Sequence, residues 1–367
     1  MRGTPVEVPQ PRRVRVVRDA FKIDSSRARP DILGMRALVT GASGFIGSTL
    51  VEELCSRGYQ VRALMRARSS SEHLMGQQYE RASGDLSDRD SLLAAVQGVD
   101  VVFHLAGATV ARSRRDFFEA NTAGTARLAQ AVATAAPGLK RLVYVSSLAA
   151  AGPAQSLRAR VETERDQPVS AYGESKLQAE QELLRHCAKF PISIVRPPLV
   201  YGPRDRATLL FFQTIAKNVL PVLKGRTADG HKYYSAIHVR DLCQGLVLAA
   251  EGQGVRSGEV FFLADDGMVT FEGMFSEIAR ALGKKPRRLA VPRMALRLLA
   301  AGGSVASALA RKPVPLNLDK LQEILPDYWI CSNQKAKRLL GFDPQYDLAR
   351  GIAETAEWYV RNEWLSA

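Results

Sequence analysis

The stretch TGASGFIG, residues 40–47, decides the fold of this 367-residue chain. It follows the apolar run RALV and precedes STLVEELCSRG, whose apolar residues recur at helical spacing. A strand therefore turns into a helix at a point that holds three glycines. Gly41 permits the tight turn, Gly44 lets the backbone approach a pyrophosphate, and Gly47 allows close packing of the helix. The stretch predicts the phosphate-binding turn of a dinucleotide site.

The same alternation of strand and helix continues toward the carboxyl end. Apolar runs, which predict strands buried on both faces, occupy residues 59–65, 99–107, 140–147 and 191–198. Helical patterns occupy residues 115–136 and 170–188. This alternation specifies an α/β fold with a parallel, doubly wound sheet. We expect residues 35–205 to form this nucleotide-binding domain. Residues 206–367 should form mainly a smaller α/β substrate-binding lobe, with segments that return to the first domain.

Two other segments bear on the organisation of the chain. Residues 1–34 show no sustained period, and we expect them to be a disordered or non-native extension, with Met35 as the biological start. No run of 18 uncharged apolar residues occurs, so no spanning helix is expected. The nearest candidate, residues 294–310, carries Arg297 and a Gly-Gly pair. It predicts one or two short helices packed on the substrate lobe, in preference to a membrane-surface contact.

Composition narrows the class of partner. The formal net charge is +14, but the basic residues are scattered without interleaved aromatics, so nucleic-acid binding is not expected. Four cysteines, Cys55, Cys187, Cys243 and Cys331, lie far apart and lack the spacing of a metal site. These features predict a cytoplasmic protein that acts on a small molecule and holds no metal.

The end of the second strand bears on the choice of dinucleotide. An NAD site usually offers an acidic residue there for the ribose 2′-hydroxyl. This chain has Met65 and Arg66 instead, with Arg68 close by. A guanidinium pairs well with phosphate oxygens, so NADP is preferred and NAD is the alternative. The competing interpretation is that Arg66 is a solvated surface charge.

Three residues form a candidate catalytic group. The sequence YGESK places Tyr172 and Lys176 four residues apart, on one face of a helix. A phenol is a poor base at neutral pH unless a cation stabilises the phenolate, and Lys176 can supply that charge. Ser147 ends the strand VYVSS at the edge of the sheet where ligands bind, and its hydroxyl can donate to a substrate oxygen. Ser146 is the adjacent alternative, because only one of two successive residues on a strand faces the cleft.

With these motifs in place, the chain resembles the extended short-chain dehydrogenase/reductase family, in its epimerase/dehydratase branch. The resemblance covers about residues 35–365 and implies a Rossmann-type fold. It rests on TGASGFIG (40–47), GDLSD (84–88), HLAG (104–107), NTAGT (121–125), VYVSS (143–147), YGESK (172–176), RPPLVYGPRD (196–205) and IHVRDL (237–242).

The resemblance implies roles for individual residues. Tyr172 would be the proton donor or acceptor, Lys176 would hold the nicotinamide ribose and lower the pKa of Tyr172, and Ser147 would orient the carbonyl. Asp85 and Leu86 would contact the adenine. The full set of candidate cofactor-binding residues is Gly41, Ser43, Gly44, Phe45, Ile46, Gly47, Arg66, Asp85, Leu86, Ala106, Gly107, Asn121, Tyr172, Lys176 and Pro198.

Some residues in these motifs have plainer interpretations. His104 is better explained as a core residue at the end of a strand than as a catalyst. Asp241 is expected to cap the helix RDLCQGLVLAA. Asn121 would support the helix near the active site, or simply satisfy buried backbone groups.

Departures from the family pattern bear on the substrate. Leu148 and Ala149 stand where dehydratases carry an acidic pair, so dehydration is rejected. Leu199 stands where many sugar-nucleotide epimerases carry an Asn that reaches the pyrophosphate. The pattern is closer to 3β-hydroxysteroid dehydrogenases and dihydroflavonol reductases, although Arg204 and Arg206 could bind phosphate.

We therefore expect an NADP(H)-preferring oxidoreductase that acts on a carbonyl or secondary alcohol of a largely apolar substrate, of the steroid, flavanonol, acyl or terpenoid type. A nucleotide-sugar epimerase with tightly bound cofactor is the alternative. A non-catalytic nucleotide-binding sensor or assembly factor is a third interpretation, against which the intact Ser147, Tyr172 and Lys176 argue. The resemblance also implies a homodimer through the helices that hold Asn121 and Tyr172.

Overall fold

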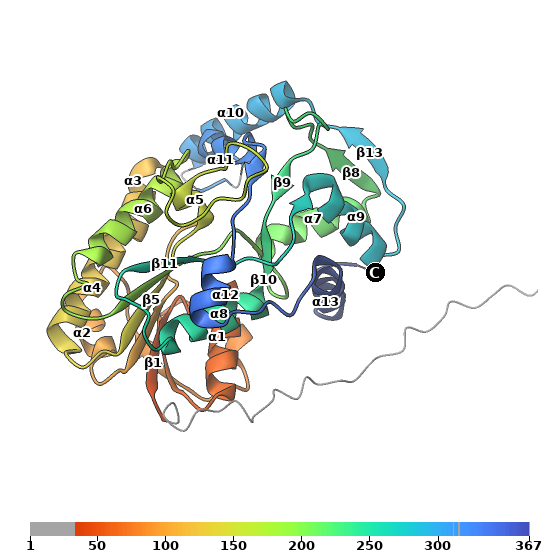
Figure 1. Ribbon diagram of the computed structural model, residues 1–367. Helices are drawn as coiled ribbons and strands as arrows, with labels where there is room; N and C mark the ends of the chain where they lie inside the picture. The colour runs from red at the N-terminus through yellow and green to blue at the C-terminus, as the bar shows by residue number, and fades with distance from the viewer. Residues whose placement is uncertain (1–33, 311, 315, 367) are drawn as a thin grey trace, which may run out of the picture.

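The structure, a computed structural model, describes residues 34–310, 312–314 and 316–366, without the side chains of residues 308 and 309. The expected N-terminal extension therefore lies, apart from Gly34, outside the described residues. A large lobe is built around one parallel sheet, and a smaller lobe lies beside its carboxyl edge (Figure 1).

Seven parallel strands form the central sheet, in the order β11-β6-β5-β4-β1-β2-β3. Their bounds are β1 Arg36–Thr40, β2 Gln60–Met65, β3 Tyr79–Ser83, β4 Val101–His104, β5 Arg141–Val145, β6 Ile192–Arg196 and β11 Glu259–Phe262. The predicted α/β fold with a doubly wound parallel sheet is confirmed. The sequence patterns did not predict β3, because this edge strand, YERAS, is largely exposed and lacks an apolar run.

Helices cover both faces of this sheet, and each face has its own apolar core. On one face lie α1 Phe45–Ser56 and α8 Val239–Glu251, with α12 Gln334–Leu340 packed against α8. On the other lie α2 Arg89–Val96, α4 Gly124–Ala135 and α6 Ala171–Leu184 (Figure 1). Because α8, β11 and α12 follow residue 205 in the chain, the C-terminal half returns to complete the first lobe.

The long helix predicted for residues 115–136 is three joined segments. These are α3 Arg114–Phe117, a π-helical segment Phe118–Ala123 and α4. The π-helical segment contains Asn121, and such segments are frequent at functional sites.

The smaller lobe has its own apolar core, centred on Phe212, Phe275 and Tyr359. Its helices are α7 Arg206–Ala216, α9 Phe271–Ala281, α10 Arg293–Ala310, α11 Leu318–Ile324 and α13 Leu348–Arg361. Its short strands are β7 Leu199–Tyr201, β8 Val219–Val222, β9 Tyr233–Tyr234, β10 Ala236–His238, β12 Val269–Thr270, β13 Arg287–Ala290 and β14 Tyr328–Trp329.

Of two expectations for this half of the chain, one holds in part and the other is wrong. Residues 294–310 belong to one helix, α10, which packs on α11 of the smaller lobe as expected, but this helix is 18 residues long and leaves Met294, Leu298, Leu299 and Val305 exposed. Asp241 does not cap α8, because the helix begins at Val239 and places Asp241 inside its first turn. The Asp241 carboxylate instead accepts hydrogen bonds from the backbone N–H groups of Gln345 and Tyr346, at 3.0 and 2.9 Å. Among the described residues, no helix combines the length and the hydropathy needed to cross a bilayer.

Candidate active site

The glycine-rich turn joins β1 to α1 and has no room for a side chain at Gly41 or Gly47. Gly41 has a φ of +72°, and a Cβ there would lie 2.9 Å from the backbone nitrogen of Ala106. A Cβ on Gly47 would lie 2.1 Å from the carbonyl oxygen of Gly41. The amino end of α1, with Gly44 as its N-cap, has neither a capping side chain nor an acid in its first turn. Its N–H groups therefore suit an anion, and the turn fits the pyrophosphate of a dinucleotide.

The other predicted cofactor residues follow the carboxyl edge of the sheet. Ala106 and Gly107 come directly after β4, Ser147 follows β5, and Pro198 follows β6. A Cβ on Gly107 would lie 2.7 Å from the Asn121 side-chain oxygen and 3.4 Å from the Lys176 nitrogen. The turn after β4 therefore runs directly beside the lysine of the candidate catalytic group.

A buried hydrogen-bond chain links the glycine-rich turn to the helix that carries Tyr172. His104 Nδ1 lies 2.7 Å from Thr40 Oγ1, and His104 Nε2 lies 2.9 Å from Thr125 Oγ1. The Thr125 hydroxyl donates to the carbonyl of Asn121, so it can only accept from His104, whose Nε2 then carries the proton. Burial lowers the pKa of His104 to about 3, with a smaller effect from the Lys176 charge. His104 is therefore a neutral core residue, as the plainer interpretation of the sequence had it.

Asn121 continues this chain of hydrogen bonds into α6, the helix that carries Tyr172. Its side-chain oxygen accepts from the backbone N–H of Ala108 at 2.7 Å. Its amide nitrogen donates to the carbonyl of Ala108 at 3.0 Å and to Ser175 Oγ at 2.9 Å. Ser175 in turn donates to the carbonyl of Tyr172 at 2.7 Å. Asn121 therefore does both things that the sequence suggested. It satisfies buried backbone groups, and it connects the turn after β4 to α6 through hydrogen bonds.

Ser147, not Ser146, faces Tyr172. The Ser147 side chain caps α5 Leu148–Ala151 by accepting from Ala149 N–H, and its hydroxyl lies on the side of Tyr172, whose pKa it lowers. The Ser146 hydroxyl points the other way and donates to the buried carboxylate of Glu180. The alternation along β5 therefore assigns the cleft to Ser147.

The Tyr172 phenol is held in its neutral form. Burial and the negative charge of Glu323 raise its pKa, and the nearby Ser147 hydroxyl lowers it by less. The expected lowering by Lys176 is not found here. The Lys176 ammonium donates to the carbonyl of Val145 at 2.9 Å and lies 4.9 Å from the centre of the Tyr144 ring. A phenol that keeps its proton is suited to act as an acid.

Helix α11 approaches Tyr172 from the smaller lobe, which no sequence motif indicated. Asp319 accepts from the backbone N–H of Ala171 at 2.6 Å, and Glu323 accepts from Ser170 Oγ at 2.7 Å. Tyr172, Phe117, Val110 and α11 enclose a space of about 10 Å³, which is room for about one water molecule. In this conformation α11 therefore covers one side of Tyr172.

Arg66 lies exposed at the end of β2, as the sequence order requires. Arg81 of β3, which the sequence patterns missed, donates to the carbonyls of Arg66 and Ala67 at 3.2 and 3.4 Å. Hydrogen bonds from Ser87 lower the pKa of the nearby Asp85, and the Arg66 charge adds to this effect. The end of β2 thus presents basic side chains to the solvent beside the glycine-rich turn.

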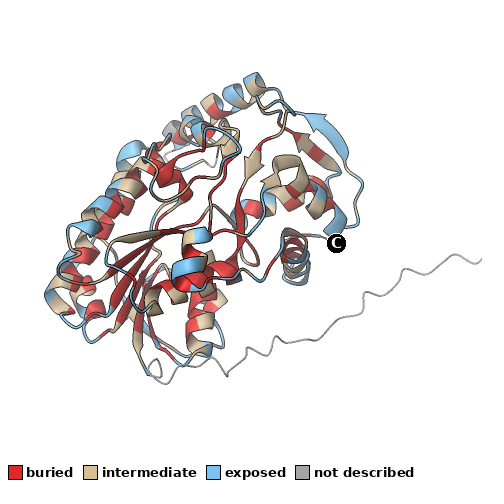
Figure 2. Cartoon of the chain, in the orientation of Figure 1, coloured by how far each residue is buried: buried red, intermediate tan, exposed pale blue. Residues whose placement is uncertain are grey.

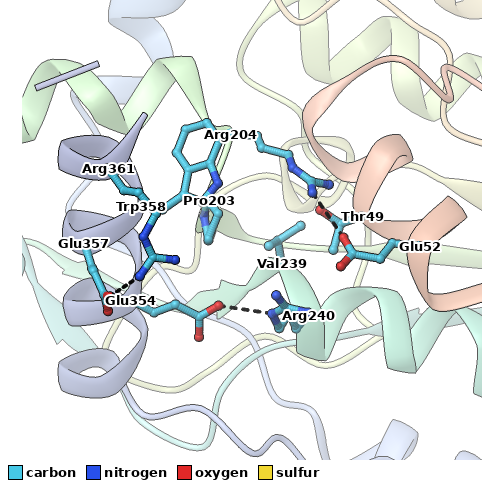
Figure 3. Close-up of a pocket in the computed structure, with 10 residues that line it drawn as sticks. All are labelled: Thr49, Glu52, Pro203, Arg204, Val239, Arg240, Glu354, Glu357, Trp358 and Arg361. Carbon is cyan, nitrogen blue, oxygen red and sulfur yellow. Dashed lines mark hydrogen bonds and ion pairs between the residues drawn. The ribbon is translucent and has the colours of Figure 1, made fainter. Parts of the chain in front are cut away.

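A larger cavity, of about 200 Å³, lies between α1, α8 and α13 and contains none of the candidate catalytic residues (Figure 3). Its charges are paired within the cavity: Arg204 with Glu52 at 3.1 Å, Arg240 with Glu354 at 3.1 Å, and Arg361 with Glu357. Arg204 is therefore engaged by a carboxylate rather than held free for a phosphate. Arg206 lies over the ring of Trp364, with its guanidinium 4.6 Å from the ring centre.

Comparisons with known proteins agree with this geometry. The model of the "NAD dependent epimerase/dehydratase family" matches residues 37–264. A ketoreductase of a farnesylated quinoline oxide from Stigmatella aurantiaca is 32% identical, over 87% of this chain and 95% of that protein. A ceramide reductase from Caulobacter vibrioides is 30% identical, over 89% of this chain and 95% of that protein. The solved structure of MoeE5 with UDP-glucuronic acid and NAD superposes with a TM-score of 0.69 at 26% identity, over 89% of this chain and 99% of that one.

Proposed function

The chain belongs to the NAD dependent epimerase/dehydratase family, and from this premise we propose that it is an NADPH-dependent reductase of an apolar ketone. The observation that carries the proposal is the neutral phenol of Tyr172, which lies near Ser147 and packs against apolar side chains. The Phe117 ring lies 5.9 Å from the Tyr172 ring, centre to centre. Such surroundings favour a carbonyl carried on an apolar body over a charged sugar diphosphate.

The residues divide the work of carbonyl reduction. When bound, the reduced nicotinamide supplies a hydride to the carbonyl carbon. The Ser147 hydroxyl donates a hydrogen bond to the carbonyl oxygen and stabilises the charge that develops there. Tyr172 transfers its proton to this oxygen, which completes the alcohol. Lys176, beside Gly107, would hold the nicotinamide ribose, and the glycine-rich turn would hold the pyrophosphate.

Relatives support the apolar substrate class. The names of two of them, the ketoreductase and the ceramide reductase, describe reduction of lipophilic molecules. A third relative, a 3β-hydroxysteroid dehydrogenase/isomerase from Mycobacterium tuberculosis, is 29% identical over 89% of this chain. Leu148 and Leu199, which lack proton-transferring or amide groups, are consistent with this class.

Nucleotide-sugar epimerisation is the second candidate, favoured by the likeness to MoeE5. The two candidates separate in one assay with purified protein freed of bound cofactor. We expect apolar ketones to oxidise added NADPH, measured by nicotinamide absorbance, and UDP-sugars to be inert. The proposal would be overturned if UDP-sugars were interconverted without net change of the cofactor and no ketone caused oxidation of NADPH. If the protein binds the nucleotide but turns over neither the ketones nor the UDP-sugars, it would instead be a sensor.

The preference for NADPH is proposed from Arg66. Replacing Arg66 by Ala should lower kcat/KM for NADPH by about 10- to 100-fold, because one charge-assisted contact to the 2′-phosphate is lost. The value for NADH, which lacks this phosphate, should change little and serves as the internal control. Arg89→Ala, an exposed arginine on α2, is the matched variant. An equal loss with both cofactors would show that Arg66 does not read the phosphate.

The pH dependence should follow Lys176. Burial lowers the pKa of Lys176 to about 8, so its ammonium is present below this pH and is lost as the pH rises through it. Because the ammonium would hold the cofactor, we expect kcat/KM for NADPH to fall as the pH rises through about 8. Tyr172, whose pKa is raised, stays protonated over this range. The measurement uses subsaturating NADPH, where kcat/KM reports the free enzyme, and a flat profile through this region would contradict it.

A further inference from the structure

Helix α10 exposes four of its large apolar side chains to solvent. Met294, Leu298, Leu299 and Val305 are 61%, 68%, 61% and 59% exposed. The side that packs inward on α11 instead carries small residues such as Ala300, which is fully buried. A surface helix ordinarily buries its apolar stripe in the core, so this arrangement is the reverse of the usual one. We call Met294, Leu298, Leu299 and Val305 the α10 face.

The apolar surface extends along the chain beyond the helix. Strand β13 leads directly into α10, and its Leu289 is 57% exposed. Figure 2 shows β13 exposed along its length and α10 exposed or intermediate over most of its outer side. Both elements lie at the outer end of the smaller lobe, away from the central sheet (Figure 1). The α10 face is therefore free of the rest of the described chain.

The net charge around the α10 face is positive. Residues 278–318 include nine Arg and Lys and no Asp or Glu. Lys285, Arg287, Arg297 and Lys312 are exposed, and none has an acidic partner among the described residues. Three other basic residues, Arg280, Arg288 and Arg293, are paired with carboxylates, so the unpaired charge is positive. Large apolar side chains amid an excess of basic residues are the features of a helix that lies in the interface of an anionic bilayer.

From these two observations we propose that the α10 face docks on an anionic lipid bilayer. The apolar side chains would enter the boundary between headgroups and acyl chains, and the basic residues would meet lipid phosphates. A second copy of the chain suits the surface less well, because it would bring the same positive charge to the contact.

The position of the face gives this docking a consequence for catalysis. Helix α10 packs on α11, and α11 contacts the amino end of the helix that carries Tyr172 through Asp319 and Glu323. Docking would thus bring the bilayer next to the cover of the catalytic tyrosine. A ketone dissolved in the bilayer would then be the substrate. This statement about the substrate rests on the proposed function, whereas the docking itself does not.

The test measures flotation of the full chain with lipid vesicles, with no cofactor or substrate present. Vesicles of phosphatidylcholine with phosphatidylglycerol should carry the protein, and added salt should weaken this binding. Vesicles of phosphatidylcholine alone should bind at least about tenfold less. Equal flotation with both vesicles, or flotation with neither, would overturn the proposal.

Paired variants separate the two parts of the surface. Replacing Leu298 and Leu299 together by Gln should reduce binding to anionic vesicles at least about tenfold. The matched control replaces Met75 and Met268, which are 76% and 51% exposed elsewhere, by Gln and should bind as the wild type does. Thermal unfolding of each variant checks that the fold is retained. Wild-type binding by the Leu298/Leu299 variant would overturn the proposal.

The basic part is tested in the same way. Replacing Arg287 and Arg297 by Gln should abolish the preference for anionic vesicles, whereas the same charge change at Arg89 and Arg158, which are exposed elsewhere, should reduce it less. Light scattering on the wild type reports the competing occupant. If the wild type does not float with vesicles and is a dimer, and the Leu298/Leu299 variant is a monomer, the α10 face is the contact between two copies of the chain. This result would overturn the proposal.

Rates of ketone reduction show whether the docking or the proposed function is wrong. The Leu298/Leu299 variant should reduce a water-soluble ketone at the wild-type rate but a vesicle-bound ketone at least about tenfold more slowly. An enzyme that floats with vesicles but reduces no ketone would leave the docking standing and remove the reductase function. Equal loss with both ketones would show that the α10 face acts on the site itself and not through the bilayer.

Discussion

Replacing Tyr172 by Phe should lower kcat for ketone reduction by about 10²- to 10⁴-fold, which is the contribution of a positioned general acid. The Phe ring keeps the packing against Phe117, so the fold and the entry of substrate should be preserved. NADPH affinity should change little, because the glycine-rich turn and Lys176 are untouched. Steady-state kinetics and a cofactor titration measure the two quantities separately.

The control for this change is Tyr328→Phe, in which a partly buried tyrosine outside the site, stacked on Tyr233, loses the same hydroxyl. It should retain wild-type turnover. Turnover by the Tyr172 variant near that of Tyr328→Phe would remove Tyr172 as the proton donor and with it the proposed mechanism. A loss of turnover that tracks a loss of cofactor binding would instead assign the residue to the binding of NADPH.

Replacing Arg196 by Met should lower the free energy of unfolding by about 3–5 kcal/mol. The Arg196 guanidinium is 4% exposed and lies between two carboxylates, Asp166 at 2.6 Å and Glu180 at 2.5 Å. The Glu180 side chain is 3% exposed. Without Arg196 it keeps only the hydrogen bond from Ser146, and a buried carboxylate is left without a counter-charge. Urea unfolding followed by circular dichroism measures the change.

The matched control is Arg185→Met, which breaks the exposed pair between Arg185 and Glu182. Exposed pairs contribute about 0–1 kcal/mol, so this variant should unfold almost as the wild type does. Replacing Glu180 by Leu in the Arg196→Met background should restore part of the lost stability, because the unpaired buried charge is then gone. An Arg196 variant no less stable than the Arg185 variant would contradict the assignment.

This ion cluster also supports the edge of the sheet where the candidate catalytic residues lie. Arg196 ends β6, Ser146 directly follows β5 and precedes Ser147, and Glu180 lies one helical turn beyond Lys176 on α6. The cluster therefore joins the strands and the helix behind the cleft. Its sequence positions are spread over residues 146–196, and no local pattern relates them.

The sequence by itself determined the parts of this protein that depend on local pattern. The strand-to-helix turn at Gly41, Gly44 and Gly47 and the four-residue spacing of Tyr172 and Lys176 each follow from a few consecutive residues, because backbone sterics and helical period act over that range. Apolar runs buried on both faces likewise predicted the parallel sheet. β3 escaped prediction because an exposed edge strand needs no apolar run.

Only the tertiary structure decided which distant groups meet. It turned Ser147 rather than Ser146 toward Tyr172 and placed α11 over this tyrosine. It engaged Arg204 with Glu52, and it turned the apolar side of α10 outward. These outcomes depend on which surfaces pack together and which carboxylates lose their water, and both are set by contacts between residues far apart in the chain. The sequence therefore identified the chemical groups, and the packing decided the environment in which each of them works.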